Sequence, residues 1–109
     1  MKYKVLPTEL FKKQAKRLCK KYPSLPGELR ELELKLSSNP NSGICLGHDT
    51  YKIRISIQSK GKGKRSGARI ITFVVKVDQE VYLLTIYDKS EIETISDKKI
   101  SEMIKRILE

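Results

Sequence analysis

The pattern of hydrophobic and polar positions changes its period along the chain. A short alternating segment at residues 2–6 predicts a strand that ends at Pro7. Hydrophobic residues then recur every three or four positions, which predicts two helices beginning near Thr8 and Ser24 and separated by Pro23. Their hydrophobic positions are Leu10, Phe11, Ala15, Leu18, Cys19 and Tyr22, followed by Leu25, Leu29, Leu32 and Leu36. The sequence therefore predicts a helical hairpin after the first strand.

The middle of the chain has a period of two. Residues 37–48 are rich in Ser, Asn and Gly and are predicted to form a loop, after which Tyr51, Ile53, Ile55 and Ile57 alternate with polar residues. A Gly-rich tip at 60–67 leads to a strand at 69–77, and a turn at 78–80 leads to another at 81–87. These segments predict a three-strand antiparallel meander. Because 69–77 is apolar at nearly every position, alternation does not tell which way Arg69 points.

The C-terminal segment predicts a helix that begins after Ser96 or Asp97. Its hydrophobic positions are Ile100, Met103, Ile104, Ile107 and Leu108. We expect this stripe to pack on the chain's own sheet, because exposed stripes of that size are uncommon; the alternative is that it partly awaits a partner. The whole chain, residues 1–109, is expected to be one α+β domain. In it the N-terminal strand and helical hairpin pack on a mainly antiparallel four-stranded sheet, with a C-terminal helix.

The net charge restricts the class of partner. The chain has 23 Lys and Arg against 13 Asp and Glu, a formal charge of +10. Such an excess favours nucleic acid, an acidic protein or an anionic membrane as partner. The membrane is the weakest of the three, because no apolar stretch approaches the ~20 residues of a spanning helix and no signal-peptide core is visible. We expect a cytoplasmic protein, in which Cys19 and Cys45 are ordinary thiols.

The positive charge is concentrated where strands are predicted. Between Asp49 and Asp78 there is no carboxylate. The eight basic residues there are Lys52, Arg54, Lys60, Lys62, Lys64, Arg65, Arg69 and Lys76. Fixed positive charge on a folded surface is what a nucleic-acid site needs. We therefore expect the tip residues Lys60, Lys62, Lys64 and Arg65 to bind RNA. The basic outer face of the first helix is either an extension of this surface or simply solvated.

The chemistry open to these residues is limited. His48 is the only histidine, which excludes a two-histidine ribonuclease, and no spacing suggests a metal or cofactor site. The remaining candidates that can converge on one phosphate are Lys52, Arg54, Arg69, Tyr87 and Lys89. Arginines can stabilise a phosphorane-like transition state, and a lysine among other cations can exchange protons nearer neutral pH. Composition alone favours a binding-only cationic face, because basic patches far outnumber ribonucleases.

The order of segments resembles the RelE toxin family of bacterial and archaeal type II toxin-antitoxin systems, within the RelE/ParE superfamily. The resemblance covers nearly the whole chain and rests on a strand, a helical hairpin and then YKIRI, GKR, GARIITFVV and VYLLTIYDKSE. Its most specific part links three features. These are the Y-K-I-K/R strand, the Arg that opens the next strand, and the Y-x-K-x-E segment that ends the third.

The resemblance implies a small, metal-independent endoribonuclease that enters the ribosomal decoding site, cuts the bound mRNA and so inhibits translation. Family roles carry over to Lys52 and Arg54, to Arg69 as a phosphate-stabilising residue, and to Lys89 as the basic group near the leaving oxygen. Many relatives carry a catalytic aromatic in the C-terminal segment, whereas residues 90–96 have none. Tyr87 is the nearest candidate, so Lys52 is the first choice for the general base and Tyr87 the second.

The resemblance also implies partners. It predicts a cognate antitoxin that is acidic where it meets this chain, and that covers the basic cleft or displaces the C-terminal helix. Contact with mRNA and the ribosome is expected, whereas DNA contact would be indirect, through the antitoxin. Two alternatives remain, a non-catalytic ParE-like inhibitor of DNA gyrase and an RNA-binding or ribosome-binding module. The retained basic residues speak against the gyrase inhibitor, which has no need of them.

Overall fold

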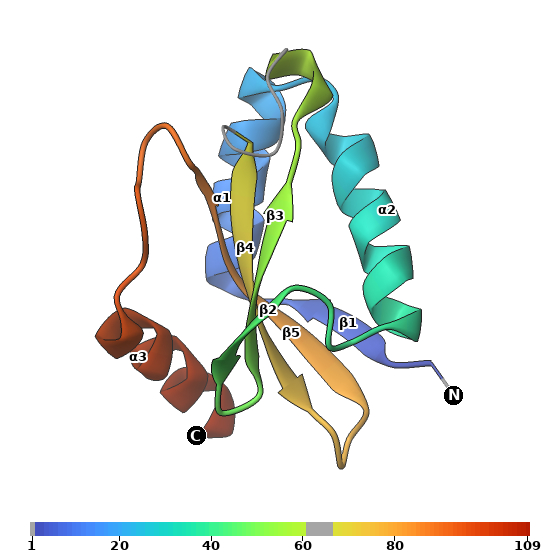
Figure 1. Ribbon diagram of the computed structural model, residues 1–109, viewed down its shortest axis with the longest axis vertical. Coiled ribbons are helices and arrows are strands. Elements are labelled where there is room, and N and C mark those ends of the chain that lie inside the picture. Colours follow the sequence, from blue (N-terminus) through green and yellow to red (C-terminus); the bar gives the residue numbers. More distant parts are fainter. Residues whose placement is uncertain (1, 61–66) are drawn as a thin grey trace.

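The computed structural model describes residues 2–60 and 67–109, which form one sheet flanked by helices (Figure 1). The elements in chain order are β1 (Lys4–Pro7), α1 (Glu9–Lys21), α2 (Leu25–Ser38), β2 (Ile44–Gly47), β3 (Thr50–Ile55), the short 3-10 helix η1 (Gln58–Lys60), β4 (Ala68–Val75), β5 (Glu80–Asp88) and α3 (Asp97–Leu108). The predicted α+β class is therefore confirmed.

The strands lie in the order β1-β5-β4-β3-β2. β1 runs parallel to β5, and the other neighbours are antiparallel. The meander of β3, β4 and β5 was predicted correctly. The sheet has five described strands, however, because β2 lies within the segment predicted to be a loop. It forms a tight hairpin with β3 through His48 and Asp49, whose φ angles are 51° and 60°.

The helix starts follow from local hydrogen bonds. The Thr8 hydroxyl accepts a hydrogen bond from the Phe11 N–H at 3.1 Å, and the Ser96 hydroxyl accepts one from the Lys99 N–H at 3.3 Å. Each bond satisfies a donor that the first turn leaves free. Ser24 precedes α2 but makes no such cap. Its hydroxyl instead accepts a 2.9 Å hydrogen bond from the Ser59 N–H, which ties α2 to η1.

The two faces of the sheet are covered by different helices. The helical hairpin of α1 and α2 covers one face, and α3 lies on the other (Figure 1). On the hairpin face, the predicted helix positions Leu18, Leu25 and Leu36 are fully buried against the sheet. On the opposite face, Ile100 of α3 is buried with Ile71 and Leu84 of the sheet. The expectation that the last helix packs on its own sheet is confirmed, except that Leu108 at its end is 68% exposed.

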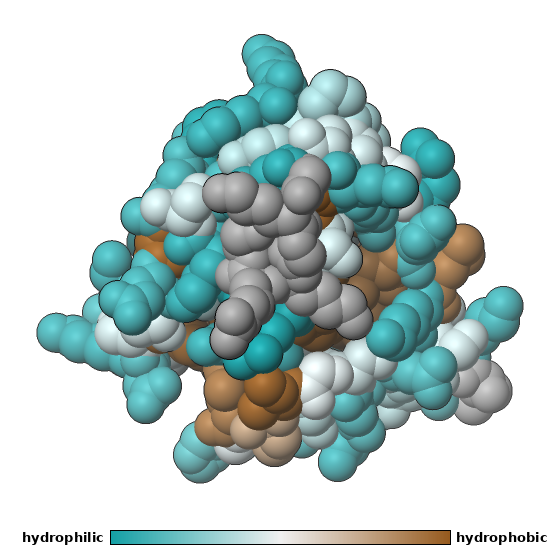
Figure 2. Space-filling model, turned by 45° about the horizontal axis from the view of Figure 1, so that its top comes forward, coloured by the Kyte–Doolittle hydropathy of each residue, from teal (hydrophilic) through white to brown (hydrophobic). Residues whose placement is uncertain are grey.

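The face of the molecule seen in Figure 2 is mainly polar. In the view of Figure 2, hydrophilic side chains cover most of the molecule and hydrophobic ones gather in a few patches. Within residues 2–60 and 67–109, none of the helices has the length and apolar character needed to cross a bilayer.

Candidate active site

Three predicted residues form one row across the sheet. The strand register places Arg54 of β3 opposite Arg69 of β4, and Arg69 opposite Tyr87 of β5. Directly opposed residues on neighbouring strands lie side by side and point to the same face. Arg54, Arg69 and Tyr87 are therefore adjacent on one surface, and we call these three residues the cross-strand row.

The row lies on the face that α3 partly covers. Tyr87 packs in the same hydrophobic cluster as Ile71 and Ile100, whereas Ile53 and Ile70 point to the helical hairpin. Arg69 must therefore point away from the hairpin. The apolar sequence of β4 alone did not determine this direction. Lys52 lies two residues before Arg54 on β3, and so it points to the face of the row as well.

The two arginines differ in exposure. Arg54 is exposed, whereas Arg69 is only 5% exposed and donates a hydrogen bond to the Ala68 carbonyl oxygen at 3.1 Å. Burial, and next the positive charge of Arg54, lower the pKa of Arg69, while Tyr87 raises it. An arginine nevertheless stays charged in proteins. The row thus places two cations side by side, one exposed and one buried.

Tyr87 is a buried phenol. Its side chain is 2% exposed, and burial raises its pKa above the usual value, although Arg69 and Thr94 act in the opposite direction. The hydroxyl has no hydrogen-bond partner of good geometry within the described parts of the chain, although the Thr94 hydroxyl lies near enough to influence it. At neutral pH Tyr87 is therefore protonated, and its hydroxyl can still donate a proton or a hydrogen bond.

Lys89 lies beyond the end of the row. Its backbone N–H donates to the Gly67 carbonyl oxygen at 3.0 Å, which continues the pairing of β4 and β5 by one residue. Its ammonium donates to the Glu93 carbonyl oxygen at 2.8 Å, in the connection between β5 and α3. The structure therefore brings Lys52, Arg54, Arg69 and Tyr87 onto one surface, and it places Lys89 at the edge of that surface, held by the connection.

The structure places Lys60, the first residue of the predicted RNA-binding tip, differently from the prediction. Lys60 is not displayed on a surface, because its side chain is 11% exposed and its ammonium lies 2.6 Å from a carboxylate oxygen of Asp88. A buried carboxylate attracts the nearest flexible cation, so Lys60 belongs to the interior beside the helical hairpin. Lys62, Lys64 and Arg65 lie outside the described residues. Sequence reasoning missed Asp88 itself, which is fully buried between Tyr87 and Lys89 in the chain.

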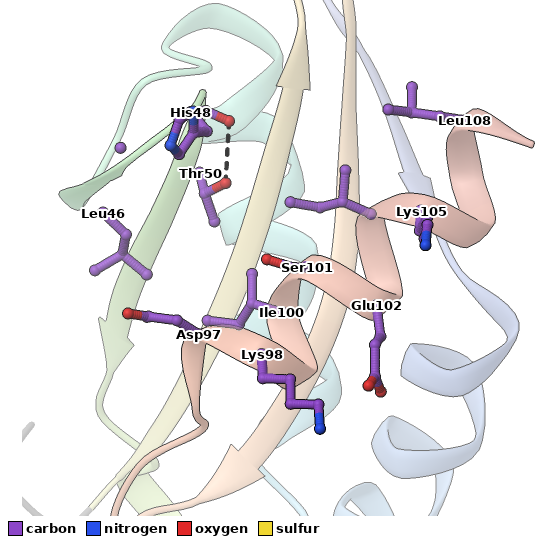
Figure 3. A pocket seen from close by; sticks show the side chains of 12 residues that line it. Leu46, His48, Thr50, Asp97, Lys98, Ile100, Ser101, Glu102, Lys105 and Leu108 are labelled. Atoms are coloured by element: carbon purple, nitrogen blue, oxygen red, sulfur yellow. Dashed lines mark hydrogen bonds between the residues drawn. The ribbon is translucent and has the colours of Figure 1, made fainter.

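A prominent groove lies elsewhere. It has a volume of about 850 Å³ and lies between α3 and the β2–β3 hairpin, with none of the predicted catalytic residues in its wall (Figure 3). His48 and Thr50 line it and are joined by a 3.2 Å hydrogen bond from the Thr50 hydroxyl to the His48 carbonyl oxygen. A second groove of about 560 Å³ between α2 and β3 includes Arg54. The row remains the candidate site for two reasons. Its two adjacent arginines can bind a phosphate together, whereas the rim of the larger groove carries both acidic and basic residues.

His48 lies outside the cross-strand row. His48 lies in the hairpin turn, as the prediction of a loop residue implied. Among the residues that the structure describes, no group of three or more His, Cys, Asp or Glu side chains is arranged to hold a metal ion.

The architecture is similar to that of a known bacterial toxin. A structure of a mutant of the E. coli toxin RelE in the free state matches 98% of this chain and 99% of its own, with a TM-score of 0.59 and 19% sequence identity. A crystal structure of the isolated E. coli RelE toxin matches 96% of this chain and 98% of its own, with a TM-score of 0.61 and 18% identity. No protein-family model matches the sequence. The chain therefore has a RelE-like fold, in agreement with the resemblance noted in its sequence.

Proposed function

We propose that this RelE-like chain is the toxin of a type II toxin-antitoxin system and that it inhibits translation by cutting ribosome-bound mRNA without a metal ion. The observation that carries the proposal is the cross-strand row. It holds two arginines and a protonated tyrosine side by side on the face that also bears Lys52. A binding-only surface needs positive charge but has no need of a buried phenol next to a buried guanidinium.

In the proposed reaction, Lys52 removes the proton of the 2′-hydroxyl, and the 2′-oxygen attacks the adjacent phosphorus. Arg54 and Arg69 stabilise the negative charge that develops on the non-bridging oxygens. The bond from phosphorus to the 5′-oxygen then breaks, and the departing oxygen takes a proton from Lys89 or Tyr87. The products are a 2′,3′-cyclic phosphate and a 5′-hydroxyl. The raised pKa of Tyr87 favours a proton donor over a base, which keeps Lys52 as the first choice for the base.

The residues of the row differ in how easily an RNA can reach them. Arg54 is exposed and can meet a phosphate directly, whereas Tyr87 lies in the cluster formed with Ile95 and Ile100. In the proposed mechanism the RNA contacts Arg54 first and reaches Tyr87 only when the segment around Ile95 moves aside. Such gating motions are common in enzymes that must exclude water until the substrate is bound.

The proposal includes the partners expected of such a toxin. An antitoxin that is acidic at its interface fits the formal charge of +10, and DNA contact would pass through that antitoxin. The ribosome and its mRNA supply dense phosphate, so they fit the same charge. A toxin that acts on translating ribosomes works in the cytoplasm.

The test is to express the chain alone and to map mRNA 5′ ends in growing cells. We expect growth arrest together with new 5′-hydroxyl ends inside translated messages, and no comparable cuts in naked RNA. Arg54→Ala should abolish these ends, whereas substitution of Arg30, another exposed arginine, which lies on α2, by alanine should leave them unchanged. Blocked DNA replication with intact mRNA would instead support the gyrase inhibitor, and RNA binding without cuts would support the binding module.

A further inference from the structure

Asp88 is a fully buried carboxylate surrounded by donors on the hairpin face of the sheet. One of its oxygens accepts hydrogen bonds from the Lys60 ammonium at 2.6 Å and from the Ser90 N–H and hydroxyl at 2.9 and 2.7 Å. The other oxygen accepts a 2.5 Å hydrogen bond from the Tyr22 hydroxyl. Lys21 adds a more distant charge at 3.9 Å. We call Asp88, Lys60 and Tyr22 the Asp88 node.

The node joins segments that are distant in sequence. Tyr22 is the C-cap residue that follows α1, Lys60 ends η1, and Asp88 is the last residue of β5. The start of α2 is tied to η1 as well, because Glu28 accepts a 2.8 Å hydrogen bond from the Gln58 N–H. One buried carboxylate thus fixes the end of β5 against two other elements at once.

The node lies on the opposite face of the sheet from the cross-strand row, at the same end of β5. Tyr87 precedes Asp88 in β5 and points to the opposite face, so any shift of Asp88 along or across the strand also shifts the phenol. Lys89 follows Asp88, and its N–H binds the Gly67 carbonyl oxygen. Gly67 has little freedom, since a Cβ there would overlap the carbonyl oxygen of Ile55. The backbone that carries Tyr87 and Lys89 is therefore held from behind by Asp88 and from the side by β4.

Stability alone does not account for this arrangement. A buried ion pair is an inefficient way to stabilise a fold, because desolvation of the two charges offsets most of their attraction and apolar residues of similar volume do as well. What a carboxylate with four hydrogen bonds supplies is orientation, since each bond limits the direction in which the group can turn. Reactive groups need supporting residues of this kind to hold them within a fraction of an ångström.

We propose that Asp88 is a positioning residue, which together with Lys60 and Tyr22 holds Tyr87 and Lys89 in place beside Arg69 for the reaction. The inference rests on the proposed function, in that it assigns a role in the same site. It does not require Asp88 to touch RNA, which the buried carboxylate cannot reach.

The test compares variants of the node with a matched control. The node variants are Asp88→Asn, Lys60→Met and Tyr22→Phe, of which the last removes a single hydroxyl. The control is Arg17→Met, which breaks the surface pair of Arg17 in α1 with Glu91, three residues beyond the end of β5. A core variant, Ile57→Val, reports the effect of lost stability alone. Each protein is assayed for its melting temperature and for kcat and KM of cleavage of ribosome-bound mRNA.

We expect the node variants to lose about 10- to 100-fold in kcat with KM little changed, as displacement of reacting groups by a fraction of an ångström does. Arg17→Met should keep its kcat. Ile57→Val should keep its kcat at temperatures well below its melting transition, even where its melting temperature equals that of Tyr22→Phe. Node variants that lose no more kcat than Ile57→Val at equal melting temperature would overturn the inference, because the role would then be purely structural.

A second measurement does not depend on activity. In NMR spectra of the folded proteins, we expect Tyr22→Phe to move the resonances of Tyr87 and Lys89, and Arg17→Met to leave them in place. Unmoved resonances in Tyr22→Phe would overturn the positioning role. If the wild-type chain cuts no RNA while these resonances do move, the proposed function falls and the positioning of Tyr87 and Lys89 stands.

Discussion

Asp88 carries a buried charge whose stabilising effect depends on pH. Burial raises the pKa of its carboxyl, but hydrogen bonds from Lys60, Tyr22 and Ser90 outweigh burial and hold the pKa well below its ordinary value. Because the folded pKa is the lower one, the stabilisation is complete above the unfolded value of about 3.9 and is lost as the pH falls below it. We expect Asp88→Asn to cost about 3 kcal/mol at neutral pH and to flatten the acid dependence of the free energy of unfolding.

Urea unfolding between neutral and acidic pH measures both effects. Glu91→Gln is the control, since Glu91 is paired with Arg17 at a partly exposed site and such pairs contribute little to stability. An Asp88→Asn protein whose stability still falls with acid as steeply as that of the wild type would show that another carboxyl dominates the acid transition.

Gly67 is required by a close approach of two strands. A Cβ at this position would overlap the Ile55 carbonyl oxygen, and backbone atoms cannot move aside as a flexible side chain can. We expect Gly67→Ala to destabilise the fold by about 1–3 kcal/mol. Gly27→Ala provides the opposite case, because nothing lies within 4 Å of its Cβ position in α2, and alanine favours a helix by up to about 1 kcal/mol. Thermal unfolding of the two variants should therefore shift in opposite directions, and a shared direction would contradict this account.

The residues of the candidate site could be predicted only in part. The basic residues of β3 and the Arg of β4 were identifiable because charges between apolar strand positions must face a surface. The direction of Arg69 was not, because alternation fails in a strand that is buried on both faces. Lys60 was wrongly assigned to an exposed tip, since its partner Asp88 is 28 positions away and nothing local marks that carboxylate as buried. Long-range pairs of charges leave no periodic signal in a sequence.

Among the elements, α3 contributes one side of the second hydrophobic cluster. Ile100 is 7% exposed and packs with Ile71, Leu84 and Tyr87, whereas Leu108 is 68% exposed. We expect Ile100→Ala to lower the free energy of unfolding by about 2–4 kcal/mol, because it leaves a cavity against the sheet. Leu108→Ala should change it by less than about 0.5 kcal/mol. Denaturant titration distinguishes the two, and equal losses would mean that α3 is packed differently along its length.

The predicted elements differ in how well the sequence determined them. The three helices have polar residues at their N-cap positions and hydrophobic stripes of several turns, so their starts were predicted correctly. Most of the predicted stripe positions are buried or partly buried, but Leu10 and Leu108 are 41% and 68% exposed. β2 was missed because it is four residues long, exposed throughout and followed by a turn without Gly at its positive-φ positions. Tertiary pairing with β3 stabilises such an edge strand, and a pattern within 44–47 cannot reveal that pairing.

At the scale of the whole molecule, positive charge lies on both sides of the sheet. The cross-strand row occupies the α3 face, and α1 on the other side bears exposed lysines at Lys12, Lys13, Lys16 and Lys20. Lys12 pairs with Glu9 at 3.3 Å, whereas Arg17 and Lys21 are directed to Glu91 and Asp88. A formal charge of +10 spread in this way attracts a polyanion from any direction, whereas the row sets two arginines beside a buried phenol on one face of the sheet. That difference separates the proposed chemistry from general binding.

The most direct measurement is the rate at which the purified chain cuts ribosome-bound mRNA under single-turnover conditions, for the wild type, Arg54→Ala and Arg30→Ala. Both variants remove one exposed arginine and the same formal charge, and only Arg54 belongs to the cross-strand row. We expect Arg54→Ala to slow cleavage by about 100-fold or more and Arg30→Ala to cut at the wild-type rate. Cleavage by Arg54→Ala at the wild-type rate, or no cleavage by the wild type itself, would contradict the assignment of the row as a ribonuclease site.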